Sequence, residues 1–164
     1  MRYHNITKED MLNGDGLRVV LWVSGCGHGC KGCQNPITWN PEDGLAFDES
    51  VKRELFEQLE KDYISGITLT GGDPLYPGNR ENIAELIEEI RYRYPEKTIW
   101  LYTGYLWEEI CNLSLIAKVD VIVDGRFILE QLDNTLYWKG SKNQRVIDVK
   151  QSLEQEKVVL HDQL

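Results

Sequence analysis

The chain has 164 residues, of which 41% are hydrophobic and 27% are charged, a composition typical of a soluble globular protein. This length predicts a single domain over residues 1–164 and excludes a complete eight-fold β/α barrel, which needs about 250 residues. The 27 acidic residues outnumber the 18 basic ones, so the net charge is −9. Such acidity argues against binding to nucleic acid or to an anionic membrane surface.

The sequence also predicts where the protein works. No apolar run approaches the roughly 20 residues of a membrane span, and no apolar signal segment follows the first five residues. We therefore expect a cytoplasmic protein, in which thiols stay reduced. In that compartment, clustered cysteines indicate metal ligands or redox groups rather than disulfides.

Strand-like and helix-like segments alternate along the chain. In chain order, we predict a strand at 18–23, a helix at 50–60, a strand at 67–70, a helix at 79–94, a strand at 98–102, a short helix at 106–112, a strand at 119–123 and a weaker strand at 145–149. Strands that alternate with helices form parallel βαβ units with right-handed crossovers. The predicted fold class is α/β, with a parallel sheet and helices on its outer face. An open partial barrel and a doubly wound sheet both fit this pattern.

Distinctive residues follow these strands. Cys26 comes after the first strand, Gly71-Gly72-Asp73 after the second, Thr103 after the third and Asp124 after the fourth. Ligands of parallel α/β sheets bind at the carboxyl ends of the strands. We therefore expect these residues to converge on one side of the sheet although they are far apart in sequence.

Cys26, Cys30 and Cys33 form a CxxxCxxC motif in a glycine-rich loop. Reduced structural thiols are one interpretation, but three cysteines at this density are unusual as core filler. A zinc site completed by His28 or Cys111 is a second, although structural zinc commonly draws two ligand pairs from separated places. A [4Fe–4S] cluster is the third: four thiolates are usual, so three leave one iron open for a substrate or cofactor. If neither residue is a metal ligand, Cys111 is interpreted as a small buried hydrophobic residue, and His28 as a loop residue that tunes access to the cluster or lies on the surface.

The motif resembles that of the radical S-adenosylmethionine superfamily, because CxxxCxxC follows the first predicted strand and Gly-Gly-Asp-Pro the second. Further segments are similar to the activating proteins of anaerobic ribonucleoside-triphosphate reductases: Gly14–Arg18, Cys33–Pro36, Tyr102–Tyr105, Val123–Gly125 and Gly140–Arg145. The resemblance covers nearly the whole chain. It implies an open partial (β/α) barrel of the radical S-adenosylmethionine type.

The resemblance also implies a site and a reaction. Cys26, Cys30 and Cys33 would hold a [4Fe–4S] cluster whose open iron binds S-adenosylmethionine. The residues expected to contact that cofactor are Gly32, Gln34, Gly71, Gly72, Asp73, Thr103 and Asp124. Reductive cleavage would give a 5′-deoxyadenosyl radical, which takes hydrogen from a glycine of the reductase, and no side chain is assigned a catalytic role.

The implied partners are the large subunit of an anaerobic (class III) ribonucleoside-triphosphate reductase and a reductant such as a flavodoxin-type protein. An activase of another glycyl-radical enzyme, of the pyruvate formate-lyase type, is the nearest alternative. A radical enzyme that acts on a small molecule and a non-catalytic zinc-binding module are more distant alternatives.

Overall fold

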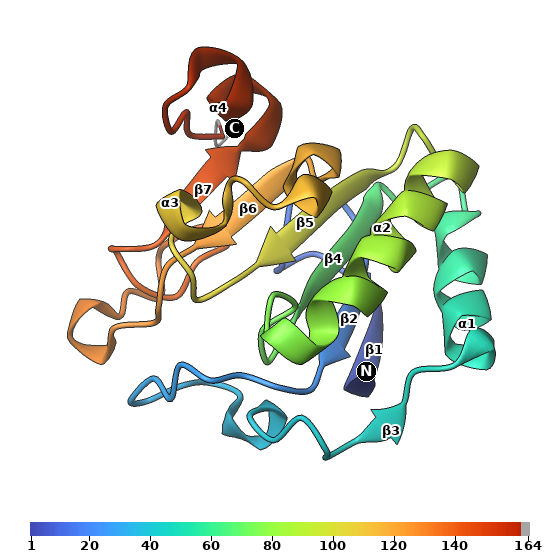
Figure 1. Cartoon of the computed structure of the whole chain (residues 1–164), viewed down its shortest axis with the longest axis horizontal. Helices are drawn as coiled ribbons and strands as arrows, with labels where there is room; N and C mark the ends of the chain where they lie inside the picture. The colour runs from blue at the N-terminus through green and yellow to red at the C-terminus, as the bar shows by residue number, and fades with distance from the viewer. Residues whose placement is uncertain (162–164) are drawn as a thin grey trace.

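The computed structural model describes residues 1–161 (Figure 1). The strands are β1 (Arg2–Asp10), β2 (Arg18–Val23), β3 (Leu45–Ala46), β4 (Gly66–Gly71), β5 (Thr98–Tyr102), β6 (Val121–Asp124) and β7 (Arg145–Asp148). The α-helices are α1 (Glu49–Leu59), α2 (Arg80–Arg93), α3 (Trp107–Ile110) and α4 (Val149–Gln155). Short 3-10 helices lie at Pro36–Thr38, Pro77–Asn79, Ser114–Lys118 and Leu129–Gln131.

One open sheet of seven strands organises the described residues, in the order β3-β1-β2-β4-β5-β6-β7. The four central strands β2, β4, β5 and β6 are parallel, as predicted. The expectation of an all-parallel sheet is wrong at both edges, where β1, β3 and β7 run antiparallel to their neighbours. A parallel return needs a crossover of a dozen or more residues, whereas a short turn joins β1 to β2. The fold is therefore α/β with a mixed sheet.

The apolar strand residues alternate between the two faces, and the helices cover only one of them. Leu21, Leu69 and Leu101 pack in one buried cluster with Leu55 of α1 and Ile87 of α2. Figure 1 shows α1 and α2 side by side in front of the sheet. Complete burial of each such aliphatic side chain stabilises the fold by about 1.5–3 kcal/mol, so this face anchors the sheet.

The opposite face of the sheet is covered by a loop rather than by helices. Trp100 of β5 packs edge-on against Trp138, with ring centroids 5.0 Å apart. Trp138 lies in the segment 126–144 that links β6 to β7, and its carbonyl accepts a hydrogen bond of 2.5 Å from the Tyr102 hydroxyl. This segment therefore supplies the second wall of the interior.

The predicted helices are confirmed to within one residue for α1 and α2. The short helix α3 ends at Ile110, and Cys111 follows it as a half-buried free thiol. The strand predicted at 145–149 is confirmed over Arg145–Asp148, and Val149 begins α4 because the Asp148 carboxylate caps that helix at the Gln151 amide. Within residues 1–161, no helix has the length and apolar character needed to cross a membrane.

Candidate functional site

A cavity of about 500 Å³ lies at the carboxyl ends of the central strands. Trp22, Thr70, Gly71 and Tyr102 line it from the sheet. The remaining lining residues come from three loops: Leu12, Asn13, Cys33, Gln34, Asn35, Phe127, Asp133, Asn134, Leu136, Trp138, Lys139, Gly140 and Gln144. The carboxyl-terminal edge of a parallel sheet is where such folds bind ligands.

The loop of residues 24–40 carries the three cysteines, and the backbone holds it at its base. Gly25 donates to the Thr38 carbonyl at 2.7 Å and Cys26 to the Trp39 carbonyl at 3.0 Å. The Gly25 carbonyl in turn accepts from the Asp73 amide at 2.7 Å. The loop is therefore attached to the turn after β4, so the Cys26 region and the Gly-Gly-Asp-Pro motif form one unit.

Cys26, Cys30 and Cys33 are free, half-buried thiols. Burial raises the pKa of the Cys26 thiol, and Asp73, Cys30 and Cys33 add to this effect. Among the described residues, no three Cys, His, Asp or Glu side chains converge closely enough to hold a single metal ion. A four-iron cluster does not need such convergence, because each thiolate binds a different iron. Three free thiols in one loop, of which Cys33 lines the cavity, therefore fit a cluster better than one zinc ion.

Gly71 and Gly72 let two backbone segments approach closely. Gly71 has φ of +109°, and a Cβ atom there would lie 2.5 Å from the Val23 nitrogen. A Cβ at Gly72 would lie 2.5 Å from the Gly25 carbonyl oxygen. These contacts explain why the turn after β4 needs two consecutive glycines beside the cysteine loop.

Asp73 is buried and accepts four hydrogen bonds from the protein. Its Oδ1 accepts from the Leu75 amide at 2.8 Å. Its Oδ2 lies 2.6 Å from His28 Nε2 and accepts from Thr103 Oγ1 at 3.0 Å and the Gly104 amide at 2.9 Å. The structure therefore joins three predicted features, namely the cysteine loop, Asp73 and Thr103. Because His28 Nε2 faces Asp73, that nitrogen is engaged within the protein.

Asp124 has a different set of partners. Its side chain is completely buried, and its carboxylate pairs with Arg145 at 2.6 Å and accepts from the Trp107 amide at 2.8 Å. Arg145 also pairs with Glu108 at 2.9 Å, and these hydrogen bonds raise the pKa of the Arg145 guanidinium. Asp124 thus joins β6, β7 and α3 at the edge of the site.

The Gly140–Arg145 segment, whose role the sequence did not define, closes a loop. Gln144 Oε1 accepts from the amides of Gly140 and Ser141, at 2.9 and 3.1 Å. Its Nε2 donates to the Gly125 carbonyl at 2.9 Å. This one side chain therefore fastens both ends of the segment that forms the far wall of the cavity.

The predicted site residues reach the cavity in different ways. Cys33, Gln34 and Gly71 line it directly. Gly32 has φ of +74°, and a Cβ there would lie 2.8 Å from Leu129, so the end of the cysteine loop touches the far wall. Sequence reasoning missed Trp22, Thr70 and Tyr102, although the two-residue strand period places them opposite the helix-covered residues.

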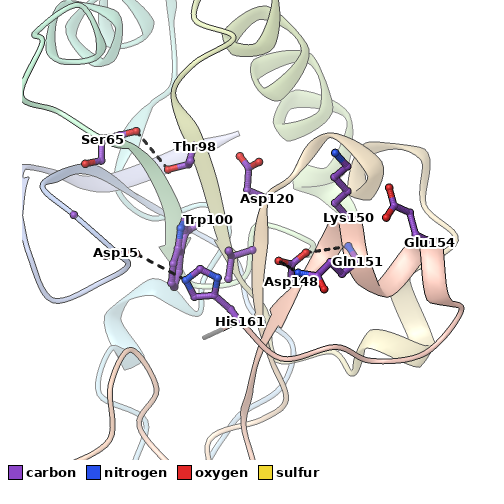
Figure 2. A pocket seen from close by; sticks show the side chains of 12 residues that line it. Asp15, Ser65, Thr98, Trp100, Asp120, Asp148, Lys150, Gln151, Glu154 and His161 are labelled. Carbon is purple, nitrogen blue, oxygen red and sulfur yellow. Dashed lines mark hydrogen bonds and ion pairs between the residues drawn. The ribbon is translucent and has the colours of Figure 1, made fainter. Parts of the chain in front are cut away.

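A second cavity, of about 640 Å³, opens at the amino ends of the strands (Figure 2). Its walls include Trp100, Asp120, Asp148, Lys150 and His161. Figure 2 shows His161 facing Trp100, and the ion pair between His161 and Asp15 measures 3.9 Å. None of the described residues that line this cavity belongs to the cysteine loop or the Gly-Gly-Asp-Pro turn, so its larger volume does not make it the candidate site.

Comparison with known proteins assigns the chain to a class. A model of the 4Fe-4S single cluster domain matches residues 12–147, which contain all three loop cysteines. The chain therefore belongs to this family of single-cluster iron–sulfur domains.

Its relatives are more specific. The chain is 49% identical over 146 residues to the anaerobic ribonucleoside-triphosphate reductase-activating protein of Enterobacteria phage T4, covering 89% of this chain and 93% of the phage protein. Proteins of the same name match from Haemophilus influenzae (39% identity, 88% of this chain, 96% of the relative) and Escherichia coli K12 (39%, 89% and 97%). Within the single-cluster class, the chain is thus a member of the anaerobic ribonucleoside-triphosphate reductase-activating protein family.

Proposed function

We propose that this protein activates an anaerobic (class III) ribonucleoside-triphosphate reductase by generating a glycyl radical on its large subunit. The observation that carries the proposal is the grouping of three free thiols in one loop, whose last cysteine, Cys33, lines a cavity at the carboxyl ends of the strands. The relatives, which match over nearly their full length, carry the corresponding name. An activase works on a protein, so the fold needs no nucleotide-reduction site of its own.

In this proposal Cys26, Cys30 and Cys33 are the three ligands of a [4Fe–4S] cluster. When bound, the reduced cluster would supply the electron for reductive cleavage of S-adenosylmethionine, the chemistry by which a glycyl radical would be formed on the reductase. The protein contributes the loop that presents the thiolates and walls that limit water. We therefore propose that the protein is a radical S-adenosylmethionine oxidoreductase and that its single domain is an open partial (β/α) barrel of the type found in that superfamily.

The residues around the cavity would bind S-adenosylmethionine in parts. The carbonyls of Gly71 and Gly72 are proposed to accept hydrogen bonds from its ammonium group, because no side chain stands between the backbone and the ligand. The backbone of Gly32 and Gln34 is proposed to contact the adenine. Asp73 would add a negative charge on the ammonium side.

Two further residues belong to the proposed site by position. Thr103 and Asp124 stand at the carboxyl ends of β5 and β6, which is the ligand-binding edge of a parallel sheet. Their side chains already bond within the protein, to Asp73 and Arg145, so we propose that they shape the cofactor site from behind.

The proposed partners follow from the reaction. The large reductase subunit donates the glycine hydrogen, and a reductant such as a flavodoxin-type protein supplies the electron. A reduced cytoplasmic setting would keep the three thiols available. The acidic surface, with a net charge of −9, gives no reason to expect nucleic acid as a partner.

The test is electron paramagnetic resonance on a mixture of the iron-loaded protein, the large reductase subunit, a reductant and S-adenosylmethionine. We expect a glycyl radical signal that is absent when S-adenosylmethionine is omitted. An intact four-iron cluster that produces no such signal on the reductase would contradict the proposal. Stoichiometric zinc without iron in anaerobically prepared protein would contradict the metal assignment as well.

A further inference from the structure

His28 and Asp73 join the cysteine loop to the sheet through buried side chains. His28 Nε2 lies 2.6 Å from Asp73 Oδ2, and their side chains are only 6% and 1% exposed. Three other protein donors, from Leu75, Thr103 and Gly104, hold the carboxylate in place. The segments that follow β4 and β5 therefore hold the Asp73 carboxylate in place independently of the cysteine loop.

A fitted socket receives the His28 ring. A Cβ atom at position 104 would lie 2.4 Å from His28 Cδ2, so only glycine leaves room for the imidazole. The Tyr105 ring packs edge-on against it, with centroids 4.7 Å apart and planes at 76°. The Tyr105 ring is itself in contact with the Arg80 guanidinium, whose carbon lies 5.3 Å from the ring centroid. These contacts define one position for the His28 side chain.

Apart from Gly32, which approaches Leu129, the rest of the loop tip makes few contacts. A Cβ at Gly27 or Gly29 would meet no atom within 4 Å. Lys31 is exposed. Within residues 1–161, His28 makes the single side-chain hydrogen bond that joins residues 27–32 to the remainder of the protein. Hydrogen bonds to charged groups are the stronger kind, so this contact dominates the placement of the loop tip.

We propose that His28 is a positioning residue, anchored by Asp73, which holds the tip of the cysteine loop so that Cys26 and Cys30 keep the separation that the cluster requires. His28 lies midway between these two cysteines and contributes no ligand. The inference rests on the proposed function only in taking the three thiols as cluster ligands. It assigns the Asp73 carboxylate mainly to the protein, while the neighbouring glycine backbone serves the cofactor.

The test compares four full-length chains loaded with iron: wild type, His28→Ala, His28→Gln and Asp73→Asn. The measurements are iron release to a chelator and deuterium exchange of the amides of residues 26–33. We expect His28→Ala and Asp73→Asn to raise both rates about ten-fold or more. Glutamine keeps an amide donor, so His28→Gln should recover most of the wild-type rates. Lys31→Ala is the matched control in the same loop and should leave both rates unchanged.

The outcomes separate this inference from the proposed function. Equal exchange and iron release in wild type, His28→Ala and Lys31→Ala would overturn the positioning role, whatever the activity. An altered cluster spectrum at unchanged iron content in His28→Gln would overturn it in favour of direct ligation. Unchanged exchange in the β5 amides shows that a variant is folded. If a variant takes up no iron, the same exchange measurement on the cluster-free chains decides. Loss of the glycyl signal in wild type would instead contradict only the proposed function.

Discussion

The two ends of the central strands carry cavities of similar size but different construction. At the amino ends, the space of about 640 Å³ is lined by Asp15, Thr98 and Trp100, which contact the completely buried Arg18 behind them. Arg18 makes five hydrogen bonds, all to uncharged acceptors on Asp15, Ile67, Thr68 and Thr98. At the carboxyl ends, the space of about 500 Å³ is lined by the free thiol of Cys33, the last cysteine of the loop that also carries Cys26 and Cys30, and by Gly71.

This difference shows that the candidate site is identified by side chains that remain free to bind a ligand, rather than by the volume of the cavity. Burial lowers the pKa of Arg18 to about 10. Its donors bond to carbonyl and hydroxyl oxygens of neighbouring strands, so its role is structural. The thiols of Cys26, Cys30 and Cys33 form no disulfide and remain available as ligands. The amino end stabilises the sheet, and the carboxyl end is free to do chemistry.

The largest effect should come from removing one thiol. Cys30→Ala leaves two ligands in the loop, too few to hold the cluster, so we expect loss of bound iron and of the glycyl signal. Iron analysis after anaerobic reconstitution and electron paramagnetic resonance measure these losses. Cys111→Ala, which removes the remaining free thiol, is the control and should retain full iron. Retained iron in Cys30→Ala would show that the ligand assignment is wrong.

At the opposite end, Arg18→Met should damage the fold without damaging the site. The substitution leaves buried acceptors without donors, and we expect the free energy of unfolding to fall by on the order of 3 kcal/mol. Urea denaturation measures this change. The iron bound per folded molecule should stay at the wild-type value. Loss of iron in Arg18→Met at unchanged stability would contradict the assignment of a structural role to the amino ends of the strands and of ligand binding to the carboxyl ends.

Gly72→Ala should weaken the junction between the cysteine loop and the turn after β4. The new methyl group would lie 2.5 Å from the Gly25 carbonyl oxygen and 2.7 Å from that of Thr38, so the two segments must separate. We expect a loss of roughly 1–3 kcal/mol in stability together with reduced iron uptake. Gly27→Ala is the matched control, because a Cβ there meets no atom within 4 Å. Equal behaviour of the two variants would contradict the close approach.

The smallest effect is expected at Glu108, on the rim of the site. Its hydrogen bonds with Arg145 hold the pKa of the Glu108 carboxyl below its usual 4.5. The stabilisation is therefore present above that pH and is lost as the pH falls through the lowered pKa. Because the side chain is 59% exposed, Glu108→Gln should cost less than about 1 kcal/mol at neutral pH. Thermal melts of both proteins should differ at pH 7, and the difference should shrink progressively as the pH is lowered below 4.5.

Local patterns predicted the centre of the fold well. Two patterns are strong signals: the apolar runs of the central strands and the 3.6-residue apolar stripes of α1 and α2. Both arise because strands and helices that adjoin in sequence bury their apolar residues against one another. The edge strand β1 escaped prediction because its residues are only half buried and alternate weakly. The two-residue β3 is too short to leave a pattern.

The candidate site divides in the same way. The spacing of Cys26, Cys30 and Cys33 and the Gly71-Gly72-Asp73 turn could be read directly, because each motif is contiguous. The partnership of His28 with Asp73 could not, because the two residues are 45 positions apart. Neither could the wall formed by Trp138 and Gln144, which depends on how the segment 126–144 folds back over the sheet.

The sequence by itself determined the class of the protein, the cysteine motif and the positions of the core strands along the chain, since these follow from short-range spacing and hydrophobic period. Only the tertiary structure decided which side chains meet. It placed His28 in the Gly104 socket, paired Asp124 with Arg145, and closed the cavity with a loop rather than with further strands. The physical reason is that packing and hydrogen bonding between distant segments depend on strand order and register, which no local pattern encodes.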